Sequence, residues 1–223
     1  MGYGFLDIAR TPSVKAAQAA NGSEAYWTAF KGDRPSDRFT EAEAQFIAKR
    51  DGFYMATVSE TGWPYVQYRG GPAGFLLLID DRTLAFADFR GNRQYISVGN
   101  LKAENRAALI LMDYARRRRL KIYARVEIKS LADDPTLAAK LAIPGYQAKS
   151  ERILLLHLEA FDWNCPQHIT PRFTEAEIAK AVQPLHFRLQ ELEAENVALR
   201  TRLVSDRAAG EKDNEKAANG QER

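Results

Sequence analysis

With 223 residues, 45% of them hydrophobic, the chain is long enough for one sizeable core with appendages but short for two full domains. Its charge is nearly balanced, at 32 Lys and Arg against 29 Asp and Glu, so the whole chain offers no electrostatic argument for nucleic acid. The chain has no apolar run of ~18 residues and no signal-peptide pattern, and its single cysteine is Cys165. These features predict a cytoplasmic protein without a membrane partner, and the charge balance predicts no nucleic-acid partner.

The first 35 residues are rich in Ala, Gly and Ser. We predict a short helix near Ser13–Ala20, ended by Asn21-Gly22, because this pair favours a turn. Residues 1–35 are expected to form an N-terminal arm that lies over the main domain.

The main domain is predicted to span residues 36–173 and to begin with a helix. Thr40 and Glu43 have the spacing of a capping box, in which each side chain binds a free backbone N–H of the first helical turn. Phe46 and Ile47 supply a face toward the core. The pattern predicts a helix from about Thr40 to Arg50.

Seven short runs of aliphatic and aromatic residues follow, and turn formers separate several of them. Consecutive strands with few helices favour an antiparallel barrel over a parallel α/β sheet. Arg90–Asn105 is predicted to form a loop and a helix across one barrel end, and Leu131–Leu141 another short helix. The expected fold is mainly β (α+β), a six- to seven-stranded antiparallel barrel with flanking helices, and the predicted strands are Phe53–Val58, Tyr65–Arg69, Phe75–Ile79, Leu84–Ala87, Ala107–Met112, Leu120–Ile128 and Ile153–Phe161.

The C-terminal part, residues 174–209, is predicted to hold two helices. Thr174 and Glu177 repeat the capping-box pattern. Pro184 is expected to end or kink the first helix, since proline lacks the backbone N–H, and a second helix can begin there. From Gly210 to the C-terminus the chain has no apolar anchors and is expected to be disordered.

A heptad pattern runs along the second of these helices. Asn196 occupies an a position, where it fixes the register of two parallel helices by pairing with its copy. In a parallel coil Arg188 would face Glu193 of the second helix, and Glu195 would face Arg200, both with opposite charge. We predict a parallel homodimeric coiled coil; the alternative is an amphipathic helix packed on its own domain, because only ~3 heptads are present. The a residues are Leu189, Asn196 and Leu203, and the d residues are Leu185, Leu192 and Leu199.

Few residues suit hydrolytic or metal chemistry. Cys165 and His168 could form a nucleophilic pair, but a packed loop is the favoured interpretation, and no second cluster completes a metal site. The stretch Arg90–Gln94 is more informative, because it follows a strand and precedes a helix, where free N–H groups and the helix dipole favour a phosphate. Arg116–Arg119 leads into an alternating strand. A solvated turn between strands explains this run, and a nucleic-acid patch is the alternative, which the surrounding acidic residues and the lack of interleaved aromatics disfavour.

The main domain resembles the pyridoxamine 5′-phosphate oxidase-like FMN-binding split barrels over roughly residues 40–130. The resemblance implies a split barrel, an FMN cofactor, and a homodimer with flavin sites at the subunit interface, to which both subunits contribute. The stretches that carry it are Phe53–Val58, Gly62–Gln67, Leu84–Asp88, Gly91–Tyr95, Asn100–Leu101, Glu104–Leu109 and Arg118–Ile122.

The resemblance also implies which residues bind the cofactor. Arg93 is the expected main charge partner of the phosphate, and Arg69 and Arg119 are the candidates to stabilise the negative charge of reduced flavin. His168 is a candidate proton donor near the substrate. The full set of cofactor-binding candidates is Gln67, Tyr68, Arg69, Ala87, Asp88, Asn92, Arg93, Gln94, Arg119, Trp163 and Arg172.

The chain departs from the family members that oxidise pyridoxamine phosphate. These usually have Arg at the place of Gln67 and Lys at the place of Gln94, and their C-terminal Arg-x-His segment is not recognisable here. The expected function is therefore an FMN-dependent oxidoreductase acting on another, unidentified small molecule. The alternatives are a non-catalytic flavin-binding or sensor module that dimerises through its zipper, and a split barrel that uses a deazaflavin or haem.

Overall fold

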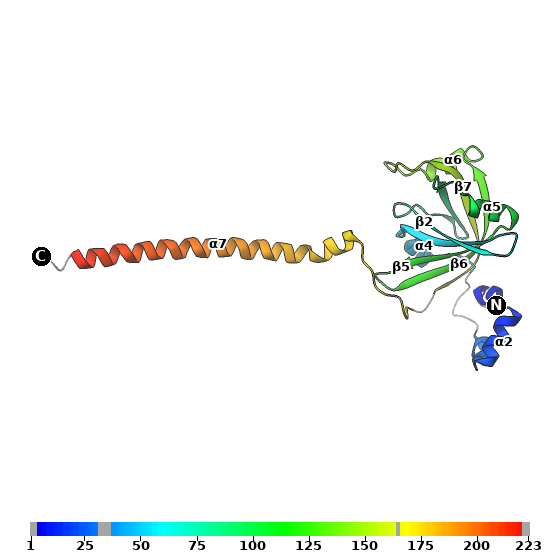
Figure 1. Cartoon of the computed structure of the whole chain (residues 1–223), viewed down its shortest axis with the longest axis horizontal. Helices are drawn as coiled ribbons and strands as arrows, with labels where there is room; N and C mark the ends of the chain where they lie inside the picture. Colours follow the sequence, from blue (N-terminus) through cyan, green and yellow to red (C-terminus); the bar gives the residue numbers. More distant parts are fainter. Residues whose placement is uncertain (1–3, 31–36, 164–165, 220–223) are drawn as a thin grey trace. The chain divides into compact units, whose positions relative to one another are not determined.

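The computed structural model describes residues 4–30, 37–163 and 166–219. The chain divides into two compact units, residues 1–171 and residues 172–223. The first holds the sheet and the helices around it, and the second consists mainly of one long helix (Figure 1).

Seven antiparallel strands form one curled sheet in the described part of the first unit (Figure 1). The strand order is β2-β1-β5-β6-β7-β4-β3, and β2 and β3 at its two ends do not pair, so the barrel is not closed. Each predicted run overlaps a strand, which confirms the split-barrel fold. The strands are β1 (Gly52–Val58), β2 (Pro64–Gly70), β3 (Leu77–Asp80), β4 (Thr83–Phe89), β5 (Arg106–Asp113), β6 (Arg118–Ser130) and β7 (Ser150–Trp163).

The barrel core is built by the period-two alternation of these strands. In β6 the residues Leu120, Ile122 and Ala124 are buried while their neighbours are exposed or half-buried. The corresponding faces of the other strands meet them, because side chains alternate across a strand. The fully buried large side chains include Phe53, Met55, Leu84, Phe86, Leu109, Leu111, Ile153 and Phe161.

Strands β4 and β7 are buried on both faces, and this explains their nearly continuous apolar sequence. Helix α6 (Pro135–Lys140) covers their outer face, where Leu137 packs with Ala85 and Ile153 in a second, smaller apolar cluster. The helix is shorter than the predicted Leu131–Leu141, because Asp134 caps its N-terminus through the backbone N–H of Leu137.

Two further helices border the barrel. Helix α4 (Glu41–Ala48) has the predicted capping box, in which Glu43 accepts hydrogen bonds from the backbone N–H and the hydroxyl of Thr40. Helix α5 (Ile96–Ala103) follows β4 within the predicted Arg90–Asn105 segment. The loop before it forms the site described below.

Within its described residues, 4–30, the N-terminal arm contains three short helices, α1 (Gly4–Ala9), α2 (Pro12–Ala20) and α3 (Glu24–Ala29). Helix α2 confirms the predicted helix near Ser13–Ala20, and the turn at Asn21-Gly22 follows it. Helix α1 packs on the barrel: the ring of Phe5 stacks on Tyr123 with centroids 4.6 Å apart.

The second unit corrects two predictions. Helix α7 (Glu175–Asn219) runs through Pro184 as one element, where we expected the first helix to end or kink and a second to begin, and it extends past Gly210, where we expected disorder. Helix α7 continues past Gly210 because Ala, Glu and Lys, which have high helix propensity, dominate that segment and extend a helix already nucleated. Thr174 and Glu177 cap its start as predicted.

Candidate cofactor site

The loop between β4 and α5 is held in an unusual backbone conformation. Arg93 and Tyr95 both have positive φ, 65° and 53°, although neither is glycine. Asn92 fixes the turn, because its Oδ1 accepts from the backbone N–H of Gln94 and its Nδ2 donates to the Gln94 side chain. Such strain costs of order 1–3 kcal/mol per residue and concentrates at functional sites.

A buried carboxylate lies beside this loop. Asp88, at the end of β4, accepts from Arg69 Nη1 at 2.6 Å through Oδ1 and from Arg152 Nη1 through Oδ2. The Asp88 side chain is 5% exposed and the two arginines 13% and 17%. One carboxylate therefore orients two guanidinium groups that come from β2 and β7.

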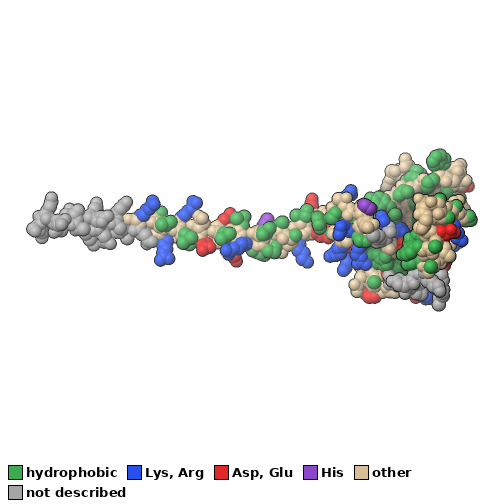
Figure 2. All heavy atoms as spheres, turned by 90° about the horizontal axis from the view of Figure 1, so that it is seen from below, with side chains coloured by type: hydrophobic (Ala, Val, Ile, Leu, Met, Phe, Trp, Pro, Cys, Tyr) green, Lys and Arg blue, Asp and Glu red, His purple; other side chains and the backbone are tan. Residues whose placement is uncertain are grey.

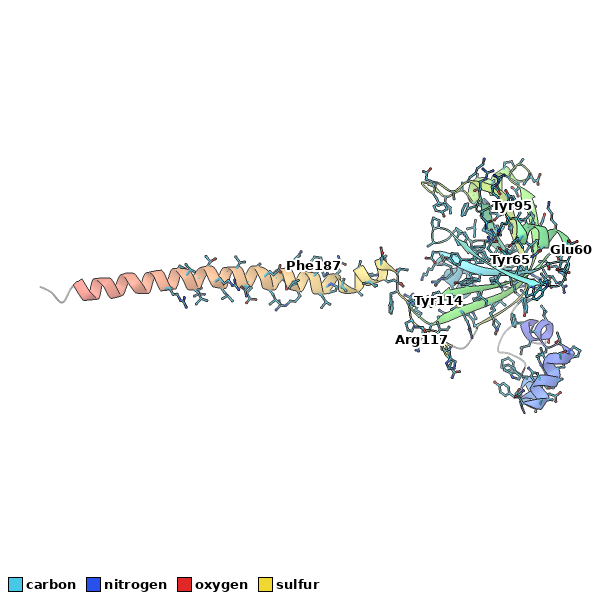
Figure 3. The ribbon with its side chains drawn as sticks, in the orientation of Figure 1. Glu60, Tyr65, Tyr95, Tyr114, Arg117 and Phe187 are labelled. Atoms are coloured by element: carbon cyan, nitrogen blue, oxygen red, sulfur yellow. The ribbon has the colours of Figure 1, made fainter. Side chains whose placement is uncertain are left out.

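A second carboxylate anchors the loop to β7. Glu151 accepts from Arg90 Nε at 2.8 Å, from the Tyr95 hydroxyl at 3.2 Å and from Arg152 Nη2 at 3.0 Å. The hydrogen bond from Arg90, followed by that from Tyr95, holds the pKa of Glu151 below its ordinary value. Tyr95, labelled in Figure 3, directly precedes α5. The guanidinium of Arg152 lies over its ring, 4.9 Å from the centroid.

These groups enclose a hollow of about 50 Å³. On its β2 side, Ser97 of α5 donates to Gln67 Oε1 at 3.0 Å, which leaves the amide nitrogen of Gln67 to donate elsewhere. The first turn of α5 adds backbone N–H groups without intrahelical partners. Its lining residues include Gln67, Arg69, Asp88, Gly91, Asn92, Arg93, Tyr95, Ser97, Glu151 and Arg152.

The hollow carries a positive excess. Three arginines line it, at positions 69, 93 and 152, with the carboxylates Asp88 and Glu151, and Arg90 outside the lining pairs with Glu151. In the described part of the chain the guanidinium of Arg93 has no hydrogen bond or ion pair, and the buried Arg69 Nε has no acceptor. A buried unpaired N–H costs about 1–3 kcal/mol, so this site fits an anionic group with several acceptor oxygens, such as a phosphate.

The structure brings together five of the predicted cofactor-binding residues, Gln67, Arg69, Asp88, Asn92 and Arg93, with Gln94 in the same loop. Two neighbours point elsewhere. Tyr68 lies on the opposite face of β2, half exposed, with its ring over Gly52 and against Tyr54. Ala87 faces the cluster under α6.

Four other predicted residues lie outside the hollow. Trp163 donates from Nε1 to the buried Glu43 at 2.6 Å, and its ring packs on Phe46. Arg119 lies on β6, and its buried Nε also lacks an acceptor within the described residues. Arg172 belongs to the second unit. His168 is exposed in a turn, and Cys165, its proposed pair, lies outside the described residues.

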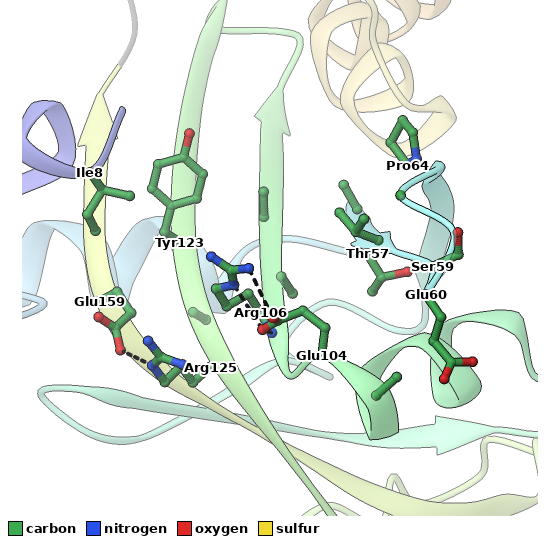
Figure 4. Close-up of a pocket in the computed structure, with 17 residues that line it drawn as sticks. Ile8, Thr57, Ser59, Glu60, Pro64, Glu104, Arg106, Tyr123, Arg125 and Glu159 are labelled. Atoms are coloured by element: carbon green, nitrogen blue, oxygen red, sulfur yellow. Dashed lines mark hydrogen bonds and ion pairs between the residues drawn. The ribbon is translucent and has the colours of Figure 1, made fainter. Parts of the chain in front are cut away.

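A larger groove, of about 950 Å³, borders β1, β5 and β6 beside α1 (Figure 4). None of the predicted site residues lines it. Four of its charged side chains pair with one another, Arg106 with Glu104 and Arg125 with Glu159, and Glu60 adds a negative charge at its edge, so the groove offers no positive charge to a phosphate.

Elsewhere the described residues hold no group of three or more His, Cys, Asp or Glu side chains that could bind a metal ion. None of the helices in the described ranges is both long and apolar enough to cross a membrane.

Comparison with known proteins agrees with the fold. The sequence model of the pyridoxamine 5′-phosphate oxidase family matches residues 39–154, which is more than half of the chain and includes every residue that lines the hollow. The chain belongs to the pyridoxamine 5′-phosphate oxidase family. No curated protein matches it.

Solved structures of similar fold have low sequence identity to this chain. HupZ of Group A Streptococcus is 16% identical with a TM-score of 0.45, over 60% of this chain and 99% of that one. A putative pyridoxamine 5′-phosphate oxidase from Lactobacillus delbrueckii is 20% identical with a TM-score of 0.44, over 57% and 95%. An FMN-binding protein from Syntrophomonas wolfei is 14% identical with a TM-score of 0.39, over 56% and 84%.

Sequence reasoning missed Arg152, Glu151 and Ser97. The antiparallel register pairs Asp88 with Arg152 across β4 and β7, although 64 residues separate them in the chain. The only signal in the sequence was the pair of charges at the start of an otherwise apolar run, which is also typical of a strand end.

Proposed function

We propose that the protein binds FMN with its phosphate in the arginine-lined hollow between β2, β4, β7 and the start of α5. The observation that carries this proposal is the unpaired guanidinium of Arg93 beside the buried, unpaired Arg69 Nε, at a helix N-terminus within a family-matched segment. An anion there would accept from the buried Arg69 Nε, which has no acceptor among the described residues, and would pair with the exposed guanidinium of Arg93.

The hollow accounts for one end of the cofactor. Ligand pockets for whole molecules measure roughly 300–1,000 Å³, far above the volume found here. We infer that the rest of the site forms between two subunits. Arg119, which does not line the hollow of its own chain, is then a residue that a second subunit would contribute, and its unpaired Nε supports this assignment.

Five residues of the hollow have proposed roles in binding. Arg93 and Arg152 would hold the phosphate as charged donors, and Asp88 keeps the guanidinium groups of Arg69 and Arg152 oriented before any ligand arrives. The Ser97 hydroxyl holds Gln67 with its amide nitrogen free to donate. FMN, when bound, supplies hydride or electron transfer, so we propose an oxidoreductase acting on a small molecule.

The absence of a recognisable C-terminal Arg-x-His segment, which helps to bind the substrate in family members that oxidise pyridoxamine phosphate, argues against that compound as the small molecule, and the neutral residues at positions 67 and 94 are a further departure from those members. Arg93 and Arg152, which line the hollow, would supply the positive charge toward the cofactor phosphate that these two positions lack. The substrate therefore belongs to another chemical class, and the candidate proton donor remains His168.

The first test is spectroscopic. Purified protein should be yellow and release FMN on denaturation, and anaerobic NADH or NADPH should bleach the flavin band. A flavin band that no reductant bleaches would favour the non-catalytic binding module. A colourless protein that gains no band on adding FMN would sink the cofactor proposal, and added deazaflavin and haem would then be compared.

The second test is the substitution Arg93→Ala. Loss of a charged hydrogen bond to phosphate should weaken FMN binding by about 1.5–3 kcal/mol, or roughly 10- to 150-fold, measured by flavin fluorescence quenching. Arg117→Ala is the matched control, because Arg117 is another exposed arginine with positive φ (53°), in the turn before β6 (Figure 3). Equal affinities of the two variants would remove Arg93 from the site.

A further inference from the structure

Helix α7 exposes a continuous apolar seam that its own unit does not cover. Within the described part of the chain its leucines at 185, 189, 192, 199 and 203 are 44–67% exposed. In Figure 2 hydrophobic side chains follow the described length of this helix between charged ones. Soluble proteins rarely leave such a contiguous apolar surface without a partner.

The continuity of α7 through Pro184 lengthens this seam. Because the helix does not break there, Ile178 and Val182 continue the heptad at a d and an a position. Pro184 itself occupies a c position, away from the seam. The a and d positions from 178 to 203 thus form almost four heptads, the length at which such a pattern becomes strong evidence for a coiled coil.

The seam has defined ends. The next core positions after Leu203 are Asp206 at d and Gly210 at a, neither of which packs as an apolar knob. The next flanking pair, Arg202 with Arg207 of a second helix, would have like charge. The two inner pairs, Arg188 with Glu193 and Glu195 with Arg200, have opposite charge. Electrostatic attraction between two parallel helices is therefore expected between residues 188 and 200 and not beyond Leu203.

We propose that α7 binds a second copy of this chain as a parallel, in-register coiled coil over residues 178–203. Only this arrangement places Asn196 opposite its own copy, where the two amides can hydrogen-bond; an antiparallel pair would set the amide against a leucine. The same arrangement matches the inner flanking charges. This proposal is independent of the flavin, because none of its residues lies in the hollow.

Cross-linking of the full-length chain tests the arrangement. In a Cys165→Ser background, Leu203→Cys and Val182→Cys place thiols at a positions at the two ends of the seam. With diamide as oxidant, which takes up two electrons and two protons as the two thiols form a disulfide, each should give a covalent dimer. Ala198→Cys, at an outward c position in the same helix, is the matched control and should give at least tenfold less.

Each other outcome has a defined meaning. Equal yields at 198 and 203, or no dimer at 203, would overturn the coiled coil. Dimers formed only when the 182 and 203 variants are mixed would overturn the parallel orientation. Dimers at 203 without dimers at 182 would overturn the extension through Pro184. Adding Leu192→Glu with Leu199→Glu should abolish the 203 dimer, whereas Ala198→Glu should not.

Discussion

At the scale of single residues, Asp88 organises the candidate site. Its two oxygens each accept from a different arginine, and all three side chains are largely buried. Removing one partner of a buried charge network leaves the others uncompensated, which costs far more than the net value of the pairs. The site therefore depends on a carboxylate that need not contact the ligand.

Asp88→Asn is expected to destabilise the first unit by about 3 kcal/mol, because Arg69 and Arg152 would lose their counter-charge in a nearly dry environment. Urea unfolding monitored by tryptophan fluorescence measures this change. Asp81→Asn is the matched control: it breaks an exposed ion pair with Arg38, and such pairs contribute about 0–1 kcal/mol. Equal losses in the two variants would contradict a special role for Asp88.

At the scale of elements, local sequence signals define where helices begin more reliably than where they end. Both Thr-x-x-Glu patterns cap helices as predicted, at Thr40 and Thr174. The first pattern also makes a tertiary contact that its spacing does not predict, because Glu43 accepts a hydrogen bond from Trp163, 120 residues away in the chain. Pro184, by contrast, does not end α7, because neighbouring turns on both sides already hold the helix.

The effect of Pro184 on α7 is testable by Pro184→Ala. An interior proline destabilises a helix by about 3 kcal/mol, because it lacks the backbone N–H and crowds the preceding turn. Replacing it also gives the unfolded chain more conformational freedom, which stabilises the unfolded state by about 1 kcal/mol and reduces the gain. The variant should therefore stabilise the helix by about 2 kcal/mol, seen as a later loss of helical circular dichroism on heating. Gln183→Ala is the control; a shorter or less stable helix in Pro184→Ala would mean that the proline starts a separate helix.

At the scale of the whole molecule, two independent features support the proposed second copy. The hollow has room for only one end of the proposed cofactor, and α7 exposes an apolar seam. If both proposals hold, the coil keeps two barrels together and raises the effective concentration of one for the other.

FMN binding should then depend on protein concentration in a way that the coil controls. On dilution, the full-length variant Leu192→Glu with Leu199→Glu should release half of its FMN at a protein concentration at least tenfold higher than the concentration at which the unaltered chain does so. The fluorescence of free FMN measures the amount that is released at each protein concentration. Ala198→Glu should behave as the unaltered chain, and identical release from all three would show that the coil does not support the flavin site.

The strand pattern, the capped helix starts and the heptad were readable from the sequence alone. Each is set by neighbours two to seven residues apart, and such spacing reports directly which face of a strand or helix is apolar. The position of the phosphate-favouring loop before α5 was readable for the same reason, as a basic stretch between a strand and a helix.

The composition of the site was decided by tertiary structure. Arg152 reaches Asp88 only through the register of β4 and β7, and Ser97 reaches Gln67 only because α5 lies against β2. Tyr68 and Ala87, which neighbour site residues in the chain, face away because alternation sends adjacent side chains to opposite faces. Sequence spacing thus determined the elements and the basic loop, whereas long-range strand pairing, which no local pattern encodes, determined which arginines and carboxylates meet there.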